Sequence, residues 1–310
     1  MRTWVEAEAS AEATQHWTPA VPRAARDTGK LLATWVLCAG PAIFARSHQY
    51  TWSLLLFIAP LALTTYELHR HGALRPVLAP FALSLALLVP MGAVLTVGLA
   101  DDFFTYPTAS ATLGLTFPAV DLDGVHHAFQ IPIEELLFYV LGFASLLALY
   151  AWADTQLFPR IRPLMRRSHV SLPEVLLALS AGVALSAAGW AIQRVANPGA
   201  AMPGYWLYLM LVPTPVVIAF GPAMAARLNW PALTVVCLAL WGHSILWEVT
   251  LAIPQGWWGY QPRSMLGLTV AAWHDLPIEA VLVWLLTPFA TVISFEVLRE
   301  RLTPMHRRTP

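Results

Sequence analysis

Long runs of apolar residues, separated by short polar connections, make up most of the chain. A helix needs roughly 20 mostly apolar residues to cross the hydrocarbon core of a bilayer. The pattern predicts about eight transmembrane helices, at 28–46, 50–66, 77–100, 131–152, 172–193, 203–226, 231–252 and 277–296. The first is the weakest, because its apolar run extends only from Leu31 to Ala45. We therefore expect an all-α integral membrane protein.

The ends of the chain lack such runs. Residues 1–27 contain prolines and several charges, and residues 299–310 are rich in arginine, so we expect a polar N-terminal tail and a basic C-terminal tail.

Basic residues predict the orientation of the helices. If all eight helices cross and the N-terminus is cytoplasmic, Arg46, Arg194 and Arg263 lie on the far side, and the other 15 of the 18 Lys and Arg residues lie on the cytoplasmic side. Positive charge is retained on the cytoplasmic side of membrane proteins. The distribution favours a multi-pass protein of the cell membrane with both termini in the cytoplasm.

Two short motifs occur twice, in the same order. Leu-Gly-Leu-Thr stands at 113–116 and 266–269, and Pro-Ile-Glu stands at 132–134 and 277–279. We interpret this as a diverged duplication, with a first repeat at 28–155 and a second at 156–298. Four spans per repeat is an even number, so the repeats are expected to lie parallel in the membrane and to share an interior cavity.

Composition agrees with this class of protein. Apolar residues make up 57% of the chain and charged residues 12%, against about 25% charged residues in soluble domains. The formal net charge is zero, so the chain has no basic footprint for nucleic acid. Cys38 and Cys237 both fall within apolar runs, where we expect small buried hydrophobic side chains rather than a metal pair.

The duplicated motifs supply the first candidate functional residues, Glu134, Glu135 and Glu279. Glutamate in the first turn also suits the positive end of a helix dipole, which is the purely structural alternative. An ionisable residue in an apolar span is costly and points to function, and its occurrence in both motifs strengthens that interpretation. A glutamate kept neutral in an apolar site can deliver a proton to an apolar substrate.

Aromatic residues flank both motifs, the candidates being Phe138, Tyr139, Trp257, Trp258, Tyr260 and Trp273. They fit an aromatic belt at the membrane interface. Alternatively, some rings face inward and stabilise a carbocation with their π faces.

Polar residues near the motifs form a supporting set, which comprises His126, His127, His274, Asp275, Asp102 and Glu248. Their spacing matches no metal-ligand signature, so we expect proton relay or hydrogen bonding, and neither a metal nor a cofactor. Asp101-Asp102 lacks the final aspartate of the motif by which prenyl transferases bind magnesium diphosphate. Asp102 and Glu248 end the third and seventh predicted spans, where they either face the cavity or are solvated helix ends.

Three segments of the chain resemble motifs of a known family. Pro-Ile-Glu-Glu-Leu-Leu-Phe-Tyr at 132–139, Trp-Trp-Gly-Tyr-Gln-Pro at 257–262 and Pro-Ile-Glu at 277–279 are similar to motifs of the heterodimeric-type, flavin-independent lycopene cyclases. The two small subunits of that family would here be fused, over about residues 30–300.

The resemblance implies an isomerase of carotenoid biosynthesis. One linear end of lycopene, or of a related polyene, is protonated, and the cation closes to a six-membered ring that then loses a proton, with no net redox change. Glu134 and Glu279 are the implied principal acid and base, with Glu135 in support. The implied partners are a lipophilic polyene substrate and the lipid bilayer. Other enzymes of the carotenoid pathway are candidate partners.

The sequence departs from the family pattern at Ala280, where a second glutamate is expected. Cyclisation of only one end therefore stays open. Other readings are a carotenoid hydratase or another terpene cyclase on the same scaffold, and, from another class, a membrane transporter. An intramembrane protease of the CAAX type is disfavoured, because no arginine follows the Glu134-Glu135 pair at the required spacing.

Overall fold

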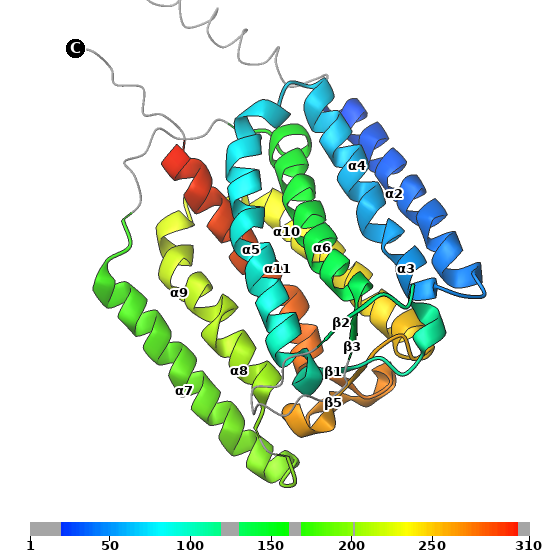
Figure 1. Ribbon diagram of the computed structural model, residues 1–310. Coiled ribbons are helices and arrows are strands. Elements are labelled where there is room, and N and C mark those ends of the chain that lie inside the picture. The colour runs from blue at the N-terminus through cyan, green and yellow to red at the C-terminus, as the bar shows by residue number, and fades with distance from the viewer. Residues whose placement is uncertain (1–19, 119–129, 161–168, 201, 303–310) are drawn as a thin grey trace, which may run out of the picture.

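A computed structural model describes residues 20–118, 130–160, 169–200 and 202–302 as a bundle of helices (Figure 1). The helices of the first part are α2 (Ala20–Phe44), α3 (Gln49–Ser53), α4 (Leu55–Arg70), α5 (Leu74–Phe103) and α6 (Ile133–Trp152). Those of the second are α7 (Leu172–Ala196), α8 (Gly204–Leu211), α9 (Pro213–Met224), α10 (Trp230–Trp247) and α11 (Ile278–Leu302). Two π-helical turns, η2 (Ala153–Leu157) and η3 (Glu248–Ala252), extend α6 and α10.

Every predicted span falls on a helix of this bundle. Within the described ranges, six helical stretches are long and apolar enough to cross a membrane, as in a multi-pass membrane protein: Gln49–Arg70, Ile133–Leu157, Leu172–Ala196, Gly204–Met224, Trp230–Ala252 and Ile278–Leu302. Helices α2 and α5 occupy the other two predicted spans and are not among the six. The count of eight spans therefore stays a prediction.

Short strands gather at one end of the bundle (Figure 1). Strand β1 (Phe104–Thr105) pairs antiparallel with β4 (Gly259–Tyr260), so the long connections of the two parts meet there. Strand β2 (Thr116–Pro118) pairs with β3 (Gln130–Pro132), and β5 (Thr269–Val270) with β6 (Leu276–Pro277). Single 3₁₀ turns, η1 (Ala109–Ala111), η4 (Pro262–Ser264) and η5 (Ala271–Trp273), complete the connections.

The duplicated motifs have the same local structure. Thr116 pairs with Pro132, and Thr269 pairs with Pro277, so each Leu-Gly-Leu-Thr segment leads into a strand beside its Pro-Ile-Glu segment. The glycines between the two leucines, Gly114 and Gly267, adopt positive φ angles of 75° and 86°. A residue without Cβ adopts this backbone conformation at little cost. Each hairpin then delivers its Pro-Ile-Glu to the first turn of a long helix, α6 or α11.

The opposite end of the bundle is held by buried ion pairs. Arg299 on α11 donates to Asp154 of η2 over 2.9 Å, and the Asn229 amide donates to the other oxygen of Asp154, also over 2.9 Å. Asp154 is 4% exposed. These contacts join the ends of α6 and α11 to the start of α10, while the main apolar core packs between the same helices.

Candidate functional site

A cavity lies between α6, α8, α10 and α11 and reaches the paired strands β1 and β4. It contains about 1020 Å³ of space that protein atoms do not fill, counting the part open to the outside. More than half of its lining residues are aromatic, and Glu135 and Glu248 are the charged ones among the described residues that line it. An apolar chamber with few polar groups is typical of a site for a lipophilic small molecule.

Helix α6 presents one face to this cavity. Glu135, Phe138, Tyr139, Gly142 and Leu146 all line it, and they recur at the three- and four-residue spacing of one helix face. Glu135 is 7% exposed, and its carboxyl group accepts a hydrogen bond of 2.7 Å from the Tyr50 hydroxyl at the start of α3. The first carboxyl group of the cavity is thus oriented by a phenol from another helix.

The second carboxyl group belongs to Glu248, the first residue of the π-helical turn η3. Single π-helical turns within helices are frequent at functional sites. Glu248 is 3% exposed, and one of its oxygens accepts hydrogen bonds of 3.0 Å from the Tyr260 hydroxyl and the Trp284 indole. Its other oxygen is buried and has no hydrogen-bond partner in the described structure.

Tyr260 lies outside the membrane-spanning helices, on strand β4. Burial raises the pKa of Tyr260 well above its usual value, and the neighbouring Glu248 carboxyl raises it further. The phenol therefore remains protonated and available as a donor over the physiological pH range. It can hold Glu248 in place whether that carboxyl group is neutral or charged.

Aromatic rings connect the two carboxyl groups. Trp247 stacks on Phe138 at a centroid distance of 5.5 Å and meets Trp258 edge-on at 4.5 Å. Trp284 forms a T-shaped pair with Phe138 at a centroid distance of 5.7 Å. These four rings all line the cavity, and π faces near a positive charge stabilise it, by about 2 kcal/mol or more when the site is desolvated.

Glu134 and Glu279 take a different place from the one expected. Both are fully buried, but neither lines the cavity. Glu134 accepts 2.7 Å and 2.5 Å hydrogen bonds from the Leu113 amide and the Thr51 hydroxyl. Glu279 accepts a 2.5 Å hydrogen bond from the Leu266 amide. Each glutamate thus ties the first turn of its helix to the first leucine of its Leu-Gly-Leu-Thr segment.

The predicted aromatic residues divide in the same way. Phe138, Tyr139, Trp258 and Tyr260 line the cavity. Trp257 is 1% exposed and lies in the core, stacked on Tyr50. Trp273 packs against Trp241 in a separate apolar cluster.

Among the supporting polar residues whose side chains the structure describes, Glu248 is the one found in the cavity. His274 and Asp275 are exposed in a turn with positive φ angles, where Asp275 accepts a hydrogen bond from Thr269. Asp102 lies in the last turn of α5. His126 and His127 lie outside the described residues.

The second motif contributes no carboxyl group to the cavity. Ala280, which stands where a glutamate was expected, is fully buried in an apolar cluster with Leu276 and Ile245. The second carboxyl group that lines the cavity is that of Glu248, in η3 at the end of α10. The two carboxyl groups of the cavity are therefore not equivalent members of the duplicated motif.

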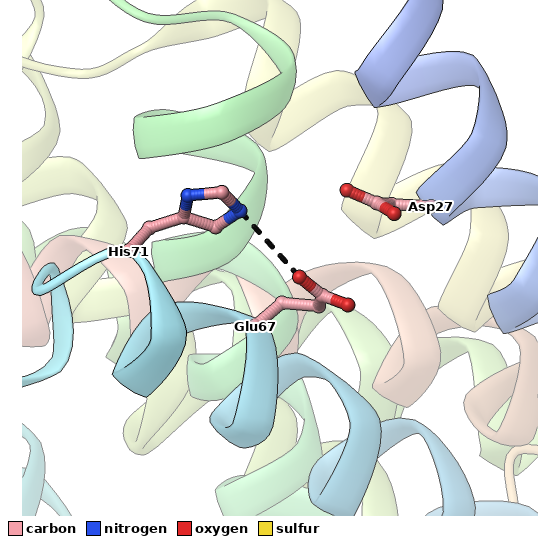
Figure 2. Close-up of side chains that lie close together, drawn as sticks. All are labelled: Asp27, Glu67 and His71. Atoms are coloured by element: carbon pink, nitrogen blue, oxygen red, sulfur yellow. Dashed lines mark ion pairs between the residues drawn. The ribbon is translucent and has the colours of Figure 1, made fainter.

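A further acidic cluster, at the other end of α4, resembles a metal site in its residue types (Figure 2). Oxygens of Asp27 and Glu67 and a His71 nitrogen lie within 4.8 Å of one another. The Lys30 ammonium group, however, is 3.0 Å from Asp27 and 3.7 Å from Glu67, and Arg70 is 3.7 Å from Glu67. These cations already compensate both carboxylates, so we interpret the cluster as an ion-pair network that joins α2 to α4.

Several cavity residues had no signal in the sequence, notably Tyr50, Tyr205, Trp247 and Trp284. Each is an aromatic residue at the start of a predicted apolar span or within one, and such residues are as common in a core as in a binding site. Glu67, outside the cavity, differs from these residues because the sequence did carry a signal for it. An ionisable residue near the end of an apolar span was a signal that could have identified it.

The chain matches no protein-family model, and no curated protein or solved structure is significantly similar to it.

Proposed function

We propose that this protein is a membrane-embedded carotenoid cyclase, similar in its reaction to lycopene β-cyclases. The observation that carries the proposal is the aromatic cavity with two buried carboxyl groups, each hydrogen-bonded by a tyrosine. An acid, a base and rings that stabilise a cation are the groups that ring closure of an apolar polyene requires. The resemblance of the 132–139 and 257–262 segments to the flavin-independent cyclases supports the same reaction.

The chemistry assigns a step to each group. A neutral carboxyl group transfers its proton to the terminal double bond of the polyene, which leaves a tertiary cation. The neighbouring double bond attacks this cation, and the new carbon–carbon bond closes a six-membered ring. A carboxylate then accepts a proton from the ring carbon next to the cation, so a double bond forms and the product is an isomer of the substrate.

We assign the acid and base roles to Glu135 and Glu248, in place of Glu134 and Glu279. Both line the cavity, whereas Glu134 and Glu279 hold backbone amides behind it. The rings of Phe138, Trp247, Trp258 and Trp284 line the same cavity and would stabilise the intermediate cation. The mostly apolar lining offers few polar groups to water, which would otherwise capture the cation as an alcohol.

The proposal includes a finer architecture. We propose that α2 and α5 also cross the bilayer, that the chain has eight spans in two parallel repeats, and that both termini are cytoplasmic. The common hairpin structure of the two Leu-Gly-Leu-Thr and Pro-Ile-Glu pairs supports the repeat. In this orientation the carboxyl groups lie near the outer face of the membrane.

Expression in a bacterium that accumulates lycopene tests the function. Pigments are separated by chromatography and weighed by mass spectrometry, while the amount of protein in the membrane is measured in the same cells. Carotenoids with cyclic ends and unchanged mass are expected. Products heavier by one water molecule would instead establish the hydratase, and unchanged lycopene in the presence of the membrane protein would contradict the proposal.

A further inference from the structure

The cavity continues well beyond the two carboxyl groups. Helices α6, α8 and α11 all begin at the strand-bearing end, and α10 runs toward it (Figure 1). Lining residues farther along α6 and α11 are Gly142, Leu146 and Pro288, and earlier along α10 there is Leu240. From Glu135 to Leu146 the helix rises about 16 Å. The cavity is thus an elongated space with its carboxyl groups at one end.

The two ends of this space differ in chemistry. Around Glu135 and Glu248 the walls carry hydrogen-bonding phenols and indoles. Around Gly142 the described lining is mostly apolar, and its polar side chains there include Tyr139, Tyr208 and Thr287. A ligand with a reactive end and a long hydrocarbon remainder fits this division.

Among the described glycines, Gly142 is the one that lines the cavity, and like the helical glycines Gly29, Gly40 and Gly242 it has open space where a Cβ would lie. A Cβ atom at Gly182, Gly189 or Gly204 would lie within 2.7 Å of a neighbouring atom, so close packing explains those residues. A Cβ at Gly142 would meet no atom within 4 Å. Glycine inside a helix costs about 1 kcal/mol relative to alanine, and packing offers no compensation here. What the glycine leaves free is space in the cavity.

We propose that the part of the cavity around Gly142 is the binding subsite for the unreacted polyene tail, and that Gly142 sets how long a tail the cavity accepts. This inference rests on the proposed function, because it takes the substrate to be a linear polyene hydrocarbon. A larger side chain at position 142 narrows the deeper part of the cavity. It leaves Glu135, about two helical turns nearer the strands on α6, and Glu248, on η3, unchanged. Discrimination by length follows from that single position.

Binding can be measured without turnover. The purified full chain in lipid nanodiscs is titrated with lycopene and with a synthetic polyene that has the same linear end but is short enough to end before Gly142, which lies about 10 Å along α6 from Glu135. Quenching of Trp247, Trp258 and Trp284, which line the cavity, reports occupancy. Gly142→Phe and Gly142→Leu are compared with Gly242→Phe, a matched control because a Cβ there also meets no atom within 4 Å and Gly242 does not line the cavity.

We expect Gly142→Phe to weaken lycopene binding by about tenfold or more, Gly142→Leu to weaken it less, and both to bind the short polyene as the natural chain does. Retained binding of the short polyene shows that the variants are folded. The inference would be overturned if the Gly142 variants bound both polyenes equally more weakly, or bound lycopene as tightly as the natural chain does. It would also be overturned if Gly242→Phe weakened lycopene binding as much as Gly142→Phe, or if the natural chain bound neither polyene. If the natural chain binds lycopene with this dependence and forms no cyclic product in cells, the proposed function fails and the tail subsite stands.

Discussion

At the scale of single residues, buried carboxyl groups differ by what they contact. Glu135 and Glu248 meet phenols and an indole on a cavity wall, whereas Glu134 and Glu279 meet backbone amides in the packed interior. Adjacent residues on a helix point about 100° apart, which is enough to put Glu134 and Glu135 in different surroundings. The duplicated motif predicted a site at this segment, and the structure shows that Glu135 lines the cavity whereas Glu134 does not.

A structural role for Glu279 predicts a loss of stability. Glu279→Ala removes the acceptor of the buried Leu266 amide, and an unsatisfied buried donor costs about 1–3 kcal/mol. Glu279→Gln keeps an acceptor oxygen and is expected to lose less. Thermal unfolding of the purified variants in detergent checks the order. An alanine variant as stable as the natural chain would refute the structural role.

Orientation of Glu248 by Tyr260 predicts a kinetic effect. Tyr260→Phe removes the 3.0 Å hydrogen bond to Glu248, and we expect ring formation to slow by about tenfold or more, because misplacing an acid or base loses much of its contribution. Tyr208→Phe is the control, since Tyr208 lines the same cavity and its hydroxyl is not bonded to either carboxyl group in the described structure. The rate of cyclic pigment formation in isolated membranes is measured. Equal rates in both variants would remove Tyr260 from the mechanism.

At the scale of elements, the sequence predicted the helices well and their rotation poorly. Length and apolar composition locate a span, so all eight predicted segments fall on helices. Helix α6, by contrast, is apolar nearly all round, and such a helix has no polar face to show which side meets a neighbour. The face formed by Glu135, Phe138 and Gly142 therefore became evident only from the packing of α6 against the other helices.

The two hairpins make a prediction at this scale. Gly114 and Gly267 have positive φ angles, and an L-residue in that conformation costs roughly 1–2 kcal/mol. A Cβ at Gly267 would also lie 2.7 Å from Asn197, while one at Gly114 would meet open space. Gly267→Ala is therefore expected to destabilise the chain more than Gly114→Ala. Unfolding midpoints in detergent compare the pair, and a reversed order would contradict this packing.

At the scale of the whole molecule, eight spans with cytoplasmic termini make one more prediction. Alkaline phosphatase, which is active only outside the cytoplasm, is fused to the N-terminus or after Pro310, and in a third chain after Gln255 of the strand-bearing end. The terminal fusions are expected to be inactive and the Gln255 fusion active. Activity at one terminus alone would mean that α2 or α5 does not cross.

The arrangement of the whole bundle also explains why Glu248, and not Glu279, is the second carboxyl group that lines the cavity. The repeated motif suggested that Glu279 faces Glu134 across a shared interior. Glu248 occupies the cavity instead, because η3 places it beside Tyr260 and Trp284. Contacts between η3, β4 and α11 join residues 12 and 36 positions apart, and helix periodicity alone does not reveal them.

The central claim is that Glu135 and Glu248 perform acid and base catalysis on a polyene, and pigment analysis of three variants tests it most directly. Glu135→Gln, Glu248→Gln and Glu134→Gln are expressed in the lycopene-accumulating bacterium, and membrane protein is quantified in each. We predict that the first two accumulate lycopene without cyclic products, while Glu134→Gln still forms rings because Gln keeps an acceptor for the Leu113 amide. Rings formed by Glu135→Gln or Glu248→Gln at the natural level, or lost in Glu134→Gln alone at normal protein levels, would contradict the assignment.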